Sequence, residues 1–451
     1  MISEDALLAR YARPVPRYTS YPTAPHFAPL ADDALYREWL KALPAKSELS
    51  IYLHVPFCRA LCLFCGCHTT VVNKPEPIAA YARTLRAEIA LLAQSLEEPF
   101  PVRHLHWGGG SPSVLDPEDF ALTMRALSRR FVFRDDAEIA VEIDPRTLSD
   151  KMIEALAANG VTRASLGVQD FDPEVLAAVH RVQPFDLVAL GVESLRKAGV
   201  TQINFDLMYG LPYQTEESVA ASAERAVALK PDRVAIFGYA HVPWVMRHQR
   251  LLPQAALPDL CARYRQQQAA AGVLTAAGYV PIGLDHFARA PDALAKAAVA
   301  GRLRRNFQGY TSDEAPVLIG FGASAIGALP QAYVQNAALV PAWSAAVNAG
   351  RLPVSRGFAL SVEDAMRREV IESIMCRLEV DLGFLAAKHG IPVETLLSPR
   401  LDAFAEDGLI IREGFFLRVA EGARPFLRAI AAAFDAYYRP ESGGPRYSQG
   451  I

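Results

Sequence analysis

Short apolar runs alternate with amphipathic stretches between about residue 49 and residue 240. The β-rich runs are LSIYLHV (49–55), RHLHW (103–107), AEIAVEI (137–143), TRASLGV (162–168), TQINFDLMY (201–209) and DRVAIFGY (232–239). Continuous apolar strands separated by helix-forming stretches are typical of a parallel sheet whose faces are covered by helices. The pattern therefore predicts six consecutive β–α units.

The stretch between the first two strands shows the helical period clearly. The apolar positions that recur there at steps of three and four are Ile78, Tyr81, Leu85, Ile89, Leu92 and Leu96. Such spacing predicts a helix with one buried face. Two later helices carry start signals, Asp116-Pro117 and Asp172-Pro173, in which an acid caps the helix and proline occupies its first turn.

Six β–α units are too many for one small flavodoxin-like sheet and too few for a complete eightfold barrel. We therefore predict an α/β fold, a partial (β/α)6 barrel, with a doubly wound sheet as the alternative. Two further segments, YVPIGLDHF (279–287) and APVLIGFG (315–322), are expected to extend the sheet.

The strand signal fades from about residue 327, which suggests a division of the chain. We expect an N-terminal arm over 1–45, a barrel over 46–326, and a smaller, mainly helical C-terminal domain over 327–451. The arm contains PRYTSYPTAPHFAP, which is rich in proline and tyrosine, and we expect it to be irregular.

Composition narrows the class of protein. The chain has 451 residues, half of them hydrophobic, with a net charge of −3, so it has ample material for a core and no global field that favours nucleic acid or anionic membrane. The N-terminus has no apolar run resembling a signal peptide. The longest uncharged stretch, 315–330, is shorter than the roughly 20 residues of a spanning helix. We expect a soluble, cytoplasmic protein without nucleic-acid or membrane partners, and a monomer.

Four of the six cysteines lie in HVPFCRALCLFCGC (54–67), directly after the first predicted strand. Disulfides are the weakest explanation, because cytosolic thiols are kept reduced. A closed zinc site commonly uses two separated ligand pairs, and Cys67 is awkwardly placed as a fourth ligand. A redox pair formed by Cys62 and Cys65 leaves Cys58 unexplained.

An iron–sulfur cluster explains the spacing C-x3-C-x2-C best, because thiolates suit such clusters. Three ligands on a four-iron cluster also leave one iron open to a small molecule. A protein whose cysteines bind a structural zinc ion remains an alternative. Cys261 and Cys376 are isolated and are interpreted as small buried apolar residues.

In a β/α barrel the chemistry lies on the loops that follow the strands. The second strand runs into Gly108-Gly109-Gly110, which either lets a ligand approach the bare backbone or forms a tight turn. Polar residues at later strand ends are Glu142, Asp144, Gln169, Arg181 and Asp206. Each alone fits a structural role as well as a functional one. Together they predict a site at the strand ends.

The three-cysteine motif resembles the signature of the radical S-adenosyl-L-methionine (SAM) superfamily. The fuller pattern YLHVPFCRALCLFCGCHT resembles the oxygen-independent coproporphyrinogen III oxidases (coproporphyrinogen dehydrogenases). Further blocks that carry this resemblance nearly from end to end are PRYTSYPTA, HWGGGSP, VEIDPR, LGVQDF, NFDLMYGLP, FGYAHVP, GLDHFAR, RNFQGYT, FDAYYRP and YSQGI.

The resemblance implies an oxidoreductase of porphyrin and haem biosynthesis. Such an enzyme decarboxylates two propionates of coproporphyrinogen III to vinyl groups and gives protoporphyrinogen IX without oxygen. The implied cofactors are a [4Fe–4S] cluster and two molecules of SAM, together with an electron donor and an electron acceptor of unknown identity. The alternative is a haem chaperone of the related radical-SAM-like group, which generally lacks the second cysteine of the Cys65-x-Cys67 pair.

The resemblance also assigns residues. Cys58, Cys62 and Cys65 would ligate the cluster. Cys67 and Tyr52 would lie near the chemistry as catalytic residues. The first SAM would contact Tyr52, Gly109, Glu142 and Ile326, and the second would contact Phe64, Gly110, Ser111, Gln169, Arg181, Asp206 and Ala240.

A substrate with four propionates calls for cationic partners. The candidates are Arg17 in the arm and Arg302, Arg304 and Arg305 beside NFQGYT. A solvated basic cluster is the commoner explanation of such arginines.

Overall fold

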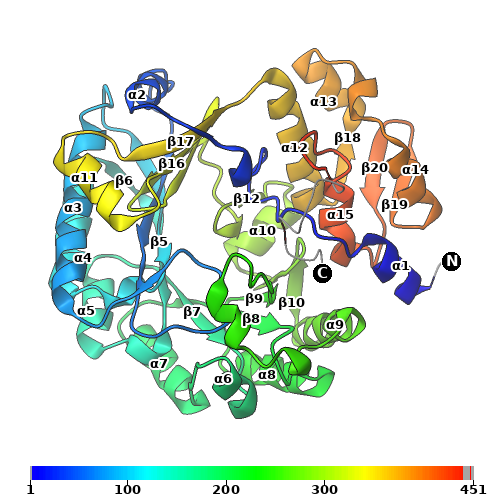
Figure 1. The fold of residues 1–451 in the computed structure, drawn as a ribbon, viewed down its shortest axis with the longest axis horizontal. Coiled ribbons are helices and arrows are strands. Elements are labelled where there is room, and N and C mark those ends of the chain that lie inside the picture. Colours follow the sequence, from blue (N-terminus) through cyan, green and yellow to red (C-terminus); the bar gives the residue numbers. More distant parts are fainter. Residues whose placement is uncertain (1–2, 440–446, 448–451) are drawn as a thin grey trace.

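Six parallel strands joined by helices form the centre of the computed structural model, which describes residues 3–439 and 447 (Figure 1). The strands are β2 (Leu49–Val55), β5 (Pro101–Gly109), β6 (Val132–Ile143), β7 (Arg163–Gln169), β8 (Gln202–Tyr209) and β9 (Arg233–Gly238). They lie side by side in chain order, and every neighbouring pair is parallel. The predicted partial barrel is therefore confirmed.

Helices lie in an arc along the outer side of these strands (Figure 1). They are α3 (Pro75–Ala93), α4 (Pro117–Ser128), α5 (Asp150–Ala158), α6 (Pro173–Ala178), α7 (Phe185–Lys197), α8 (Glu216–Ala228) and α9 (Leu260–Ala276). The predicted starts are confirmed: the side chain of Asp116 caps α4, and that of Asp172 caps α6.

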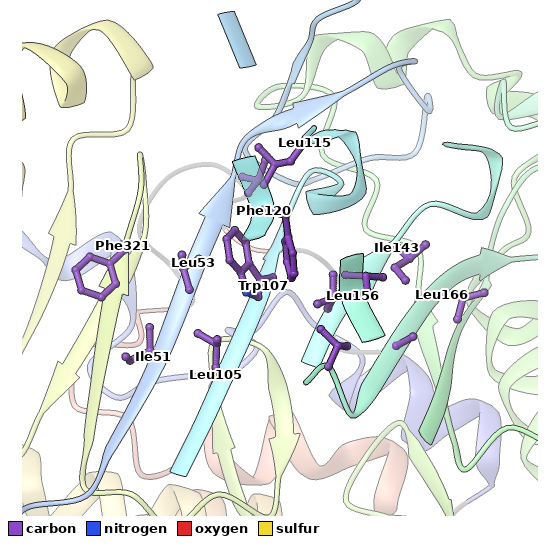
Figure 2. Close-up of a cluster of buried hydrophobic side chains, with 14 of the residues drawn as sticks. Ile51, Leu53, Leu105, Trp107, Leu115, Phe120, Ile143, Leu156, Leu166 and Phe321 are labelled. Atoms are coloured by element: carbon purple, nitrogen blue, oxygen red, sulfur yellow. The ribbon is translucent and has the colours of Figure 1, made fainter. Parts of the chain in front are cut away.

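The main core fills the space between the sheet and these helices (Figure 2). Strand residues such as Leu53, Leu105 and Trp107 are fully buried there. The ring of Trp107 packs against that of Phe120 from α4, with ring centroids 4.8 Å apart. This packing fixes one face of every strand, so the carboxyl ends of the parallel strands meet at one rim.

The sheet continues beyond the six strands at both edges. At one edge lie β14 (Val317–Phe321), parallel to β2, and then the antiparallel strands β15 (Ile326–Leu329), β16 (Ala332–Asn336), β17 (Val354–Ala359) and β1 (Ala28–Pro29). At the other edge lie the antiparallel strands β11 (His286–Arg289) and β10 (Tyr279–Ile282). Helices α10 (Ala293–Val299) and α11 (Val340–Asn348) accompany these strands.

Both predicted extensions of the sheet are confirmed. The expectation that strands give way to helices from about residue 327 is wrong. The expected boundary falls inside the sheet, because β15 to β17 still pair with it. These strands are short and include polar residues and glycine, which hides their pattern in the sequence. The division of the chain into three domains stays a prediction.

The C-terminal part is mainly helical, as expected. It contains α12 (Val362–Arg377), α13 (Leu382–His389), α14 (Pro399–Glu406) and α15 (Leu427–Ala431), together with a small antiparallel sheet of β18 (Glu379–Asp381), β20 (Phe416–Val419) and β19 (Ile410–Glu413). No helix within the described residues is long and apolar enough to cross a membrane. Pro440 and residues 448–451, which belong to two of the motifs quoted above, lie outside the described residues.

The N-terminal arm is more regular than its sequence suggests. It contains two helices, α1 (Glu4–Tyr11) and α2 (Ala34–Lys41). Between them the arm crosses towards the C-terminal part (Figure 1), where the Tyr18 hydroxyl donates to Asp435 at 3.0 Å and the Tyr21 hydroxyl accepts from the Ala436 N–H at 3.0 Å. The arm therefore shares a hydrophobic cluster with the C-terminal part of the chain.

One buried carboxylate ties α3 to the added strands. Glu88 is 1% exposed and accepts hydrogen bonds from the Gly322 N–H at 2.8 Å, Asn336 Nδ2 at 2.7 Å and Trp343 Nε1 at 3.0 Å. Three donors from separate segments thus depend on one side chain.

We predict that Glu88→Gln lowers the free energy of unfolding by about 1–3 kcal/mol, because the new amide nitrogen faces a donor and leaves a buried group unpaired. Urea unfolding followed by circular dichroism measures the change. Glu97→Gln, at an exposed position, is the matched control. Equal stabilities of the two variants would contradict the prediction.

Candidate active site

The cysteine loop is anchored at the carboxyl end of β2. Its short strand β3 (Phe57–Cys58) pairs with β4 (Thr70–Val71), and the Leu63 N–H donates to the Val179 carbonyl at 3.0 Å. Leu63 is buried in a small apolar cluster with Val175, Val179 and other residues beside α6. The loop is therefore fixed by both backbone bonds and packing.

Two neighbouring cavities open at this rim. The smaller, of about 170 Å³, is lined by Cys58, Cys62, Cys65 and Cys67, all of them free thiols. The larger has a volume of about 750 Å³. Predicted site residues that line both cavities are Phe64, Cys65, Cys67, Glu142, Gln169 and Asp206. The two cavities therefore share a wall made of residues that the sequence had singled out.

The remaining predicted site residues fall into three groups. Gly109, Gly110 and Arg181 line the smaller cavity, and Ala240 lines the larger. Tyr52, Ser111 and Ile326 are not among the described residues that line either cavity. The Ser111 hydroxyl instead lies 2.9 Å from that of Ser113, and Ile326 begins β15. The functional roles given to all these residues stay predictions.

Glu142 is held by its neighbours in an ionised state. Burial raises the pKa of this carboxyl, but hydrogen bonds from His106 Nε2 at 2.9 Å and the Gly109 N–H at 3.1 Å outweigh burial and hold the pKa below its usual value. The Tyr52 ring stacks on that of His106, with centroids 5.9 Å apart, and its hydroxyl lies 3.0 Å from His54 Nδ1. Sequence reasoning missed His106, although the two histidines of the strand RHLHW were a usable signal.

The glycine run allows two loops to approach closely. Gly109 has φ +114°, and a Cβ there would lie 2.7 Å from His54 Cε1; a Cβ on Gly110 would lie 2.5 Å from the Phe57 carbonyl oxygen. Larger residues would therefore push the second strand's loop away from the cysteine loop. The run serves this packing and also places backbone on the wall of the smaller cavity.

Asp206 and Gln169 complete the shared wall. Burial, assisted by the charge of Glu142, raises the pKa of Asp206 to about 7. Gln169 has φ +71° next to an irregularity in the pairing of β7 with β8. Left-handed backbone is costly for a residue other than glycine and is often found at functional sites.

Two arginines donate hydrogen bonds to the thiol of Cys62. Arg146 Nη2 and Arg181 Nη1 each lie 3.3 Å from Cys62 Sγ, and both guanidinium groups pair with Asp144. Asp144, which the sequence offered as a ligand acceptor, thus holds two arginines, and it also caps the turn Pro145–Thr147. Sequence reasoning missed Arg146.

These donors fit an iron–sulfur cluster. Four free thiols line one cavity, among them the three of the C-x3-C-x2-C motif. Guanidinium donors favour thiolate charge and tune a cluster through its sulfurs. No three His, Cys, Asp or Glu side chains within the described residues form a site for a single metal ion. Cluster ligands bind different irons and need not converge on one point.

Comparison with known proteins also indicates a protein that binds an iron–sulfur cluster. Residues 52–226 match the radical SAM superfamily, and residues 360–426 match the HemN C-terminal domain. The chain has the radical SAM fold, and this class uses a [4Fe–4S] cluster together with SAM.

Relatives that match over almost the whole chain define the family. The oxygen-independent coproporphyrinogen III oxidase of Bradyrhizobium diazoefficiens is 51% identical over 428 residues, which cover 94% of this chain and 95% of that protein. The same enzyme of Paracoccus denitrificans is 44% identical, with 95% of each chain covered. The solved structure of coproporphyrinogen III oxidase (HemN) from Escherichia coli matches with a TM-score of 0.88 and 36% identity, over 94% of this chain and 98% of that one. The chain belongs to the oxygen-independent coproporphyrinogen III oxidase family.

We predict that Cys58→Ala, Cys62→Ala and Cys65→Ala each abolish stable iron binding after anaerobic reconstitution, because each removes one thiolate ligand. Iron analysis and the visible absorption of the cluster measure the loss. Cys261→Ala, whose thiol lies near Asp5 instead of the cavities, should retain the iron content of the parent protein. Full iron content in the three loop variants would contradict the assignment.

Proposed function

We propose that this chain oxidatively decarboxylates two propionates of coproporphyrinogen III to vinyl groups and releases protoporphyrinogen IX without oxygen. The observation that carries the proposal is the wall shared by the two cavities. It joins a thiol-lined cavity of about 170 Å³ to one of about 750 Å³, a size within the range of sites for small organic ligands. The substrate, coproporphyrinogen III, is inferred from the names of the relatives.

When bound, the cluster and SAM supply the one-electron chemistry that removes a hydrogen atom from a substrate carbon. Each propionate then loses carbon dioxide and one further electron, so the reaction requires an electron donor and an electron acceptor of unknown identity. Cys58, Cys62 and Cys65 would hold the cluster.

We assign two SAM positions at this rim. The first would contact Tyr52, Gly109, Glu142 and Ile326, and the second would contact Phe64, Gly110, Ser111, Gln169, Arg181, Asp206 and Ala240. The ionised Glu142 supports the first assignment, because a carboxylate fits the amino and hydroxyl groups of the nucleoside.

We assign catalytic roles to Cys67 and Tyr52 on different structural grounds. Cys67 lines both cavities, which supports contact with the substrate in addition to proximity to the cluster. Tyr52 reaches the site through its stacking on His106, which in turn donates to Glu142. In this proposal Tyr52 therefore positions Glu142 in addition to contacting the first SAM.

Anaerobic incubation of the reconstituted chain with SAM, a reductant and coproporphyrinogen III tests the function. We expect protoporphyrinogen IX and cleaved SAM, both detected by chromatography and mass spectrometry. Transfer of bound haem to an acceptor protein, without any decarboxylated product, would contradict the proposal and support the haem chaperone.

The pKa of Asp206 predicts a pH dependence of SAM binding. Burial disfavours the charged form, so the contribution of Asp206 to stability is present below about pH 4 and is lost as pH rises through about 7. A cationic ligand requires the charged form. Affinity at this position should therefore increase about tenfold between about pH 6 and about pH 8.

Isothermal titration calorimetry of the reconstituted chain measures this change. Asp206→Asn should remove the pH dependence. Asp150→Asn, at the exposed start of α5, should retain it. A parent protein whose SAM affinity is the same at both pH values would contradict the prediction.

A further inference from the structure

Part of the larger cavity's wall comes from outside the six β–α units. Arg17 belongs to the N-terminal arm, Arg305 to strand β12 (Arg304–Asn306), which pairs with β13 (Gly309–Thr311), and Arg428 to α15. All three arginines line the cavity of about 750 Å³. In Figure 1 the blue arm runs beside β12 and α15, so three segments far apart in sequence meet there.

Direct contacts join these segments. Arg428 is 7% exposed and donates through Nε to the Pro16 carbonyl at 3.0 Å, and it also donates to the Val15 carbonyl. Arg305 Nη2 lies 3.4 Å from the Arg17 carbonyl oxygen. The guanidinium of Arg305 lies over the Tyr310 ring, 4.3 Å from its centroid. The aromatic ring and the backbone oxygens thus position the guanidinium groups.

Several cationic side chains meet at this junction. Burial is the main reason that the pKa of Arg428 is lowered to about 9, and the charges of Arg17 and Arg305 act in the same direction. Asp285 is a carboxylate that interacts with both Arg17 and Arg305, and it also pairs with His286 at 2.7 Å. An anionic ligand would offset the mutual repulsion of the clustered guanidinium groups.

Arg305 has unused hydrogen-bonding capacity. Its Nε and Nη1 atoms are buried and have no hydrogen-bond partner within the described residues. Elsewhere on the same cavity wall, Arg163 and Arg233 each have one buried nitrogen without a partner in the described residues, but Arg163 pairs with Glu138 at 3.1 Å and Arg233 pairs with Asp292 at 2.8 Å. Two unpartnered donors on one guanidinium, as on Arg305, are costly in the free protein.

We propose that Arg17, Arg305 and Arg428 form a subsite that binds carboxylates of the substrate other than the one that reacts. The inference rests on the proposed function, because a substrate with four propionates presents further carboxylates whenever one is at the reacting position. Guanidinium groups suit this task, since their planar donors match a carboxylate in pairs. The arm and the C-terminal domain thereby complete the substrate site.

The test compares arginines that line the larger cavity with exposed arginines that do not. Arg302 and Arg304 are exposed and pair with Glu314 and Glu372 at 3.2 and 3.1 Å. Arg302→Gln and Arg304→Gln are therefore matched controls for Arg305→Gln and Arg17→Gln. Arg428 is left intact, because it anchors the arm and its loss would perturb folding.

The first measurement is the dissociation constant of coproporphyrin III, the fluorescent oxidised form of the substrate with the same propionates, for the reconstituted full chain. We expect Arg305→Gln and Arg17→Gln to weaken binding about tenfold or more, because each removes a charge-assisted contact. Affinity for the uncharged tetramethyl ester should stay within about twofold, as should coproporphyrin III affinity in both controls. In turnover, KM should rise more than kcat falls, with iron content unchanged.

Two results would overturn the subsite: unchanged affinity for coproporphyrin III in both variants, or an equal loss for the ester, which indicates a structural defect. The proposed function fails separately. If the parent chain forms no decarboxylated product while the variants still lose carboxylate-dependent binding, the subsite stands and the reaction assignment falls. If the parent chain turns over and the variants bind normally, only the subsite falls.

Discussion

The parallel register of the central strands is the constraint on which the site depends. Val55 pairs with Gly109 across β2 and β5, Glu142 pairs with Ser165 across β6 and β7, and Gly167 pairs with Asp206 across β7 and β8. Because side chains alternate between the faces of a strand, a slip of one residue would turn an inward carboxylate towards the helices. The helix-facing core in Figure 2 fixes this register and so places the carboxylates in the cavities.

The rim and the outer segments contribute different chemistry. The rim supplies thiols, two carboxylates whose pKa values are shifted in opposite directions, and a glycine run that brings two loops together. The junction of arm, hairpin and C-terminal domain supplies guanidinium groups. The thiol-lined cavity and the larger cavity are thus neighbours, and the shared wall around Cys67, Gln169 and Asp206 lies between them.

Features set by local sequence were predictable. The first strand was predicted over 49–55, the bounds that β2 has, and the caps of α4 and α6 follow from an acid and a proline. The cysteine spacing and the flanking motifs indicated the family before any contact was known. These signals are local, because strand period, capping and ligand spacing each occupy only a few consecutive residues.

Features set by tertiary contacts were not predictable. Pairing of His106 with Glu142 depends on strand register, and Arg428 reaches the cavity from the far end of the chain. Nothing in the run Arg302 to Arg305 indicates that Arg305 faces the cavity while Arg302 and Arg304 face solvent. Strands β15 to β17 were missed because their side chains are mixed and pairing with the sheet stabilises them.

The most direct measurement is electron–nuclear double resonance of the reduced, reconstituted protein with SAM labelled isotopically in its amino and carboxylate groups. If three cysteines hold a four-iron cluster with one open iron at this rim, the labelled nuclei should show hyperfine coupling to the cluster. A cluster spectrum that SAM leaves unchanged, or a tightly bound zinc ion in place of iron, would contradict the account.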